Sequence, residues 1–153
     1  MLEEVVVTDT LIRELARTVT KHDRTIIRKM TGKTVQEALR DSVANATECS
    51  AWLKDGKIVA IIGIRQVHFL SPWAWPWMVC NNIARSYPVQ FVKMGKWWVK
   101  EKVKRYGMLS SYIVAEDAMA LRWNKALGFD ISEPQELTPG GQLVVRSTMV
   151  YVP

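Results

Sequence analysis

Hydrophobic residues recur at helical spacing in the first part of the chain. Before that, residues 3–7, Glu-Glu-Val-Val-Val, are typical of a short strand. Residues 11–20 then carry apolar side chains three or four positions apart, which predicts a helix. Asp9 or Thr10 can cap that helix, because a side-chain oxygen at this position accepts a hydrogen bond from a free backbone N–H.

A second helix is predicted over residues 31–47. Thr34 and Glu37 have the spacing of a capping box at its start. The letters TGKT around Gly32 resemble part of a phosphate loop, but such a loop needs another glycine where Ile27 stands. We therefore interpret this stretch as a turn and a helix start.

The period of the hydrophobic positions changes to that of strands in the middle of the chain. Residues 48–67 predict two strands joined by a hairpin turn at Asp55-Gly56. The extended stretch that follows contains Pro72 and Pro76. Because proline lacks the N–H that a sheet needs, we expect an edge strand or a splayed strand there.

The last part of the chain predicts alternating helices and strands. The predicted elements are, in order, a helix, a strand, a helix and two strands, over residues 88–106, 108–115, 118–127, 129–137 and 142–152. The whole order is β-α-α-β-β-β-α-β-α-β-β. It predicts an α/β (α+β) fold, a mixed sheet with helices on its faces, in a single domain over residues 1–153.

Composition narrows the class of protein. The 153 residues are 48% hydrophobic and 24% charged, typical of an ordinary globular domain, and no apolar run is long enough to span a bilayer. The N-terminus lacks the features of a signal peptide. The spacing of Cys49 and Cys80 fits no zinc site, so we expect no metal and a reducing, cytoplasmic location.

One segment near the C-terminus carries a motif. Val114 ends a predicted strand, Asp117 caps the next helix, Ala120 is small, and residues 127–129 are Leu-Gly-Phe. With the order of elements, this motif resembles the GNAT family of acetyl-CoA-dependent N-acyltransferases, in which asparagine is usual at the position of Asp117. The resemblance implies a GNAT-like fold over most of the chain.

The long predicted helix and the segment after it are also similar to small GNAT-like proteins of short-tailed bacteriophages. One branch of these proteins consists of internal virion proteins involved in head assembly. This resemblance implies a bacteriophage protein located in the host cytoplasm or in the virion, whose partners are other virion proteins.

The sequence departs from the GNAT pattern at two chemical positions. In the family, a glycine-rich loop holds the pyrophosphate of acetyl-CoA with backbone N–H groups, but residues 81–91 contain no glycine, and Pro88 removes one N–H. Many members carry a tyrosine as general acid where Asn124 stands, and asparagine has no proton to give at neutral pH. We therefore expect no catalytic residue and no cofactor.

An alternative keeps acetyl-CoA as cofactor and the chain as a divergent acyltransferase. The resemblance then places the cofactor along the end of the strand before residue 84, with an arginine in place of the missing backbone donors. The candidate cofactor-binding residues are Cys80, Asn82, Ile83, Arg85 and Ser86.

The net charge of +6 favours acidic partners. Four lysines of the predicted long helix are spaced to form one stripe, and a tryptophan lies within it. The stripe is typical of a solvated face, and it is also suited to an acidic protein surface or to phosphates. These candidate partner-binding residues are Lys93, Lys96, Trp97, Lys100 and Lys104. Nucleic acid remains a weaker alternative, supported by charge alone.

Three tryptophans at alternate positions point the same way on an extended chain. Trp73, Trp75 and Trp77 therefore form one face, either packed in the core or exposed as an apolar patch for a partner. Binding of a partner through the tryptophan face and the lysine stripe, without catalysis, is the first functional hypothesis, and the divergent acyltransferase is the second.

Overall fold

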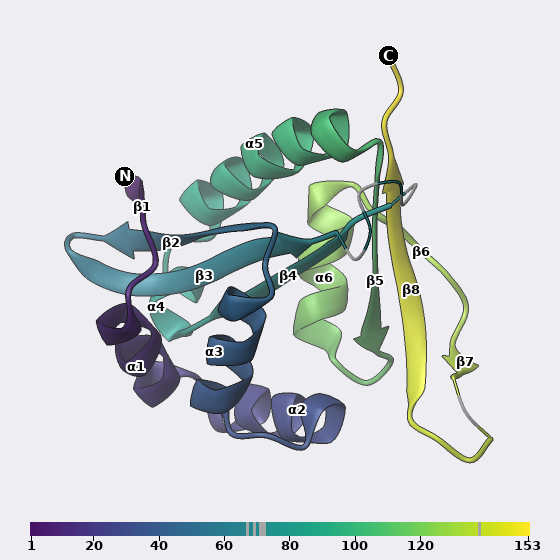
Figure 1. Ribbon diagram of the computed structural model, residues 1–153, viewed down its shortest axis with the longest axis horizontal. Coiled ribbons are helices and arrows are strands. Elements are labelled where there is room, and N and C mark those ends of the chain that lie inside the picture. The colour runs from purple at the N-terminus through teal and green to yellow at the C-terminus, as the bar shows by residue number, and fades with distance from the viewer. Residues whose placement is uncertain (67, 69, 71–72, 138) are drawn as a thin grey trace. The chain divides into compact units, whose positions relative to one another are not determined.

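The computed structural model describes residues 1–66, 68, 70, 73–137 and 139–153 and has mixed α/β architecture (Figure 1). The strands are β1 (Leu2–Val5), β2 (Glu48–Lys54), β3 (Lys57–Arg65), β4 (Trp75–Cys80), β5 (Met108–Val114), β6 (Asp130–Ile131), β7 (Gln135–Glu136) and β8 (Leu143–Val150). The helices are α1 (Asp9–Thr18), α2 (Lys21–Thr31), α3 (Val35–Ala44), α4 (Asn82–Arg85), α5 (Pro88–Tyr106) and α6 (Ala118–Leu127). The predicted fold class is confirmed. Among the described helices, none is long and apolar enough to cross a membrane.

Several predicted boundaries need correction. The predicted order lacks α2, in which only three of the eleven residues are apolar and none is buried. It also lacks α4, which is a single turn. Residues 129–137 form two strands of two residues each, because each pairs with β8 only briefly. Thr8, rather than Asp9 or Thr10, caps α1 and accepts a hydrogen bond from the Leu11 N–H.

Other local predictions are confirmed. Thr34 and Glu37 form the capping box of α3. The hairpin between β2 and β3 turns at Asp55 and Gly56, both with positive φ (51° and 79°). Of the two prolines that predicted an edge strand, Pro76 lies in β4 and Pro72 lies outside the described residues.

The chain divides into two compact units, the first of which comprises residues 1–66 and 76–91. Its sheet has the order β1-β2-β3-β4, with antiparallel pairing of β1 to β2 and of β2 to β3. β4 is at the edge, as the proline positions predict. α1 packs against α3 and β3, so one face of the central strands is covered by helices (Figure 1).

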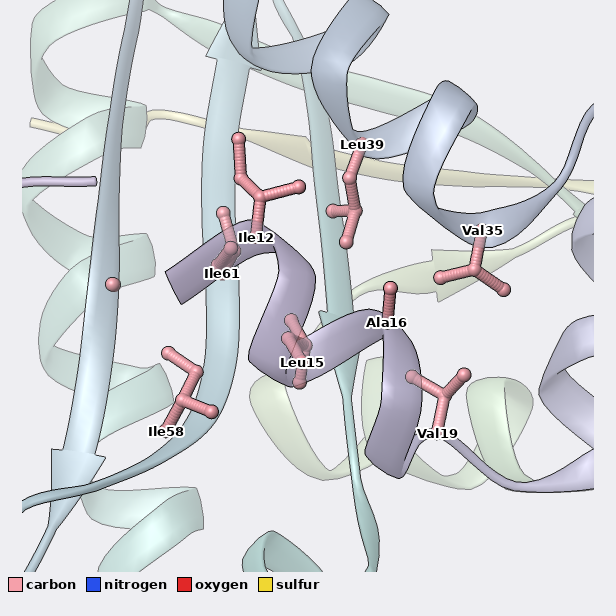
Figure 2. Packing of buried hydrophobic residues seen from close by; sticks show 9 residues of the cluster. Ile12, Leu15, Ala16, Val19, Val35, Leu39, Ile58 and Ile61 are labelled. Carbon is pink, nitrogen blue, oxygen red and sulfur yellow. The ribbon is translucent and has the colours of Figure 1, made fainter. Parts of the chain in front are cut away.

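A buried apolar cluster joins these helices to the sheet (Figure 2). It consists of Ile12, Leu15, Ala16, Val19, Val35, Leu39, Ala51, Ile58 and Ile61. Full burial of one valine, leucine or isoleucine side chain stabilises a fold by about 1.5–3 kcal/mol. The cluster therefore holds β3 in place, and Trp77 and Val79 of β4 pack against it just before the candidate site.

Trp77 packs on the sheet over a glycine. It is half-buried, and it lies against the apolar cluster. A Cβ at Gly63 would come within 2.5 Å of the Trp77 ring, so the absence of a side chain there creates the space for the indole. The third tryptophan of the alternating stretch is thus a packing residue of the first unit.

The second unit comprises residues 67–75 and 92–153. Its sheet has the order β5-β8-β6, with β7 also paired to β8, and Ala74 forms a parallel bridge to Leu109 of β5. α5 and α6 approach closely at Gly95, where a Cβ would lie 2.6 Å from the Trp123 ring. The absence of a side chain at Gly95 makes room for that ring. Gly128 ends α6 with a φ of 96°, the left-handed conformation that the sequence predicts for it.

Replacing Gly63 with alanine should displace Trp77 and lower the free energy of unfolding by about 1–3 kcal/mol, the usual cost of overpacking. Urea denaturation followed by tryptophan fluorescence measures this change. In a Trp77→Phe background the smaller ring leaves room for the new methyl group, so the same substitution should cost clearly less. Equal costs in the two backgrounds would contradict the packing described.

Candidate functional site

The segment that the GNAT resemblance assigns to pyrophosphate begins at a buried asparagine. Asn81 directly follows β4 and is 1% exposed. Its amide nitrogen donates to the Thr18 hydroxyl and to the Ile58 carbonyl, both at 2.9 Å, and its backbone N–H donates to the Val59 carbonyl at 3.1 Å. The side-chain oxygen accepts from the Ile83 N–H at 3.1 Å and caps α4. Asn81 therefore ties the end of β4 to α1, β3 and α4.

The turn of helix that follows uses its own N–H groups. The Ser86 N–H donates to the carbonyls of Asn82 and Ile83, at 3.2 and 3.1 Å. The Tyr87 N–H donates to the Ala84 carbonyl at 3.2 Å. These donors, together with the capped N–H of Ile83, are occupied within the segment, and Pro88 contributes none.

Arg85, the candidate for binding pyrophosphate, is paired with a carboxylate. Its guanidinium lies 3.0 Å from the Asp23 carboxylate of α2, and it also donates to the Asn82 side-chain oxygen at 3.3 Å. The two charged side chains are 30% and 20% exposed, so solvent screens this pair less than a fully exposed one. The Ser86 hydroxyl donates to the Asn82 carbonyl at 3.2 Å.

The structure brings the five candidate cofactor residues together, since all lie at the end of β4 or on the turn after it. Cys80 is half-buried in β4. Sequence reasoning missed Asn81, their neighbour, although asparagine at a strand end before a helix is a typical capping signal. Burial and, secondarily, the charge of Glu48 raise the pKa of the other cysteine, Cys49.

Asn124, at the usual position of the general acid, is a structural residue of the second unit. Its amide nitrogen donates to the Ala120 carbonyl, and its oxygen accepts from the Ser147 hydroxyl, both at 2.8 Å. Ser147 is fully buried in β8. The amide nitrogen is therefore used within α6 and the oxygen joins α6 to β8, and neither group can act as a proton donor to a leaving group.

The lysine stripe lies on the exposed side of α5. Lys93, Lys96, Lys100 and Lys104 are all exposed, and Trp97 beside them is 50% exposed. Trp98 is buried on the opposite side of the same helix, and Val99 and Val103, which are also buried, lie next to the lysines. This segregation follows the helical period that the sequence predicts.

A hollow of about 450 Å³ lies beside the stripe, within the second unit. Three of the stripe's lysines line it, together with Val99, Val103 and Leu127 from the helices and residues 149–152 from the end of β8 and after it. Among the described residues of this lining, none carries a negative charge. The hollow thus combines an apolar floor with a row of positive charges, and the sequence alone did not predict it.

The other candidate tryptophans have ring neighbours within the second unit. Trp73 and Trp75 are half-buried, and their ring centroids lie 6.3 Å apart. Trp75 also lies 5.7 Å from the Tyr112 ring. The structure therefore separates the predicted tryptophan face into this pair and the packed Trp77, and a role for the three in partner binding stays a prediction.

Solved structures of similar fold now give the context. Ard1 from Thermoplasma volcanium has a TM-score of 0.67 at 11% sequence identity, over 99% of this chain and 99% of that one. An acetyltransferase of the GNAT family from Bacillus anthracis has a TM-score of 0.69 at 10% identity, over 97% and 94% of the two chains. The chain has the GNAT fold. The ribosomal-protein-S18-alanine N-acetyltransferase from Escherichia coli agrees, with a TM-score of 0.63 at 11% identity over 98% and 94%.

These likenesses establish the GNAT fold and leave the activity open, because one fold hosts many functions. No protein-family model matches the sequence, and no curated protein matches it. Function must therefore be argued from the residues of the site.

Replacing Asn124 with alanine should lower the free energy of unfolding by about 1–3 kcal/mol, because the buried Ser147 hydroxyl loses its acceptor. Chemical denaturation of Asn124→Ala, Ser147→Ala and the double variant measures the coupling between the two side chains. The double variant should lose less than the sum of the single losses, since the unsatisfied hydroxyl is then gone. Strictly additive losses would contradict the pairing.

Proposed function

We propose that this GNAT-fold protein is not an acetyltransferase and acts by binding another protein, as a virion-associated or assembly protein of the bacteriophage type. One observation carries the proposal. At the position where GNAT enzymes hold pyrophosphate, the N–H groups of Ile83, Ser86 and Tyr87 are hydrogen-bonded within the segment itself.

Opening this segment for a phosphate group has a cost. α4 would have to unwind so that its donors become free, and each internal hydrogen bond contributes about 0.5–1.5 kcal/mol. Glycine-rich phosphate loops avoid this cost, because their N–H groups already point at the ligand.

The charge at the segment adds to the same conclusion. Arg85 is neutralised by Asp23, so an incoming pyrophosphate would meet a carboxylate within the same ion pair. Releasing Arg85 for the ligand would leave Asp23 partly buried without its partner. The usual chemistry also needs a general acid at the position of Asn124. The side chain of Asn124 is instead hydrogen-bonded to Ala120 and Ser147.

The surface of α5 supports a binding role. Its lysines are exposed and Trp97 is half-exposed. Tryptophan is enriched at protein interfaces. The lysines are suited to a partner with an acidic surface. The phage setting rests on the sequence resemblance, which makes other virion proteins the partners we propose.

A divergent acyl-CoA-dependent N-acyltransferase is the second candidate. It is favoured by the fold and by the placement of Arg85 on the turn after β4. In that case Arg85 would leave Asp23 and bind the pyrophosphate, beside Cys80, Asn82, Ile83 and Ser86.

Calorimetric titration of the purified protein with acetyl-CoA separates the two candidates. A non-catalytic protein should give no saturable heat at millimolar ligand, both as wild type and as Arg85→Ala. Saturable one-site binding by the wild type, lost in Arg85→Ala, would overturn the proposal in favour of the acyltransferase. Lys57→Ala, an exposed change on the β2–β3 hairpin, is the matched control for loss of one positive charge.

A further inference from the structure

The hollow beside α5 has two properties that together restrict what it binds. Lys96, Lys100 and Lys104 lie along one edge, four residues apart in each step. The floor is apolar and includes Val99 and Val103. A ligand that satisfies both must carry negative charges in a row and an apolar face beside that row.

The spacing of the lysines sets the spacing of the charges. The helical rise of about 1.5 Å per residue puts successive lysines of this set about 6 Å apart along α5. Carboxylates at positions i, i+4 and i+8 of a second helix repeat at the same interval. A helix lying along α5 would therefore present one carboxylate to each lysine.

The size of the hollow agrees with insertion of side chains. A helix with its side chains is about 10–12 Å across, so the volume of about 450 Å³ admits apolar side chains from one face rather than the helix itself. Tyr151 and Val152 border the hollow beyond the end of β8 and are 38% and 82% exposed, which leaves their apolar surface available for contact.

We infer that this hollow is the docking site for an acidic amphipathic helix of a partner protein. The helix lies along α5 with carboxylates facing Lys96, Lys100 and Lys104, and its apolar side chains enter the hollow, as in other helix-in-groove complexes. This inference rests on the proposed binding function and names the chemistry of the partner. Nucleic acid would use the lysines but not the apolar floor.

A peptide selection tests the inference on the whole protein. Displayed peptides of random sequence and about 16 residues, long enough for about four helical turns, are selected on the immobilised wild type. The recovered peptides should carry Asp or Glu four residues apart, next to a row of apolar residues. Recovery of no binding peptide, or of peptides without this pattern, would overturn the inference.

Variants then locate the site. The affinity of a recovered peptide should fall at least about tenfold in Lys96→Glu/Lys100→Glu, because the charges now repel. It should stay within about twofold in Lys21→Glu/Lys57→Glu, a control with the same change of charge at exposed lysines of the first unit. Equal losses in both variants would mean that net charge alone determines binding, and would overturn the site.

A second variant tests the apolar contact. Tyr151→Ser/Val152→Ser leaves every lysine in place and should weaken the peptide about tenfold, while circular dichroism verifies the fold. A thymidine oligonucleotide serves as the comparison ligand. If the oligonucleotide binds as tightly as the peptide and ignores the Tyr151→Ser/Val152→Ser change, the site binds nucleic acid and the inference is wrong.

The outcomes keep this inference separate from the proposed function. Acetyl-CoA binding by the wild type would contradict the non-catalytic proposal. The peptide experiments would still show whether a helix docks on α5. Failure of the peptide selection would remove the helix-docking inference while the acetyl-CoA result still decides whether the cofactor site is closed.

Discussion

The buried side chain of Asn81 is the constraint on which the candidate site depends. Its donors are used by Thr18 and Ile58, so its oxygen has one fixed direction and caps α4. A buried polar group stays in such a network because an unsatisfied donor costs about 1–3 kcal/mol. The apolar cluster under β3 holds the partners of Asn81 in place. The core of the first unit therefore determines where β4 ends and how the next turn begins.

The hydrogen bonds of the turn after β4 are the basis for proposing that this GNAT fold does not bind the cofactor. Glycine would leave the turn open and its N–H groups directed outward. Here the N–H groups of Ile83, Ser86 and Tyr87 are hydrogen-bonded within the segment, and Arg85 is paired with Asp23. In the second unit, Asn124 is held in the same manner by Ala120 and Ser147. At both positions the polar side chains therefore make their hydrogen bonds or ion pairs within the protein.

Much of the fold followed from the sequence, because helical and strand periods, the Asp55-Gly56 hairpin and the Gly128 helix end are local signals. Helix α2 was missed because most of its residues are polar and none is buried. The candidate residues after β4 were located by the resemblance to the GNAT family and by the lack of glycine where that family has its pyrophosphate loop. Their hydrogen bonds were not predictable, since Asn81 reaches Thr18, which lies 63 positions earlier. The hollow beside α5 was also not predictable, because it is lined by residues far apart in the sequence, on α5 and at the end of β8.

The central claim is that the phosphate position is closed by its own hydrogen bonds. The most direct measurement is an NMR titration of the isotope-labelled protein with inorganic pyrophosphate, following the backbone amides of Ile83, Ser86 and Tyr87. The account predicts no saturable shift of these three amides at millimolar pyrophosphate, beyond the small linear drift that ionic strength causes throughout the protein. Saturable shifts centred on these amides would contradict it, because their N–H groups would then be free to bind a phosphate.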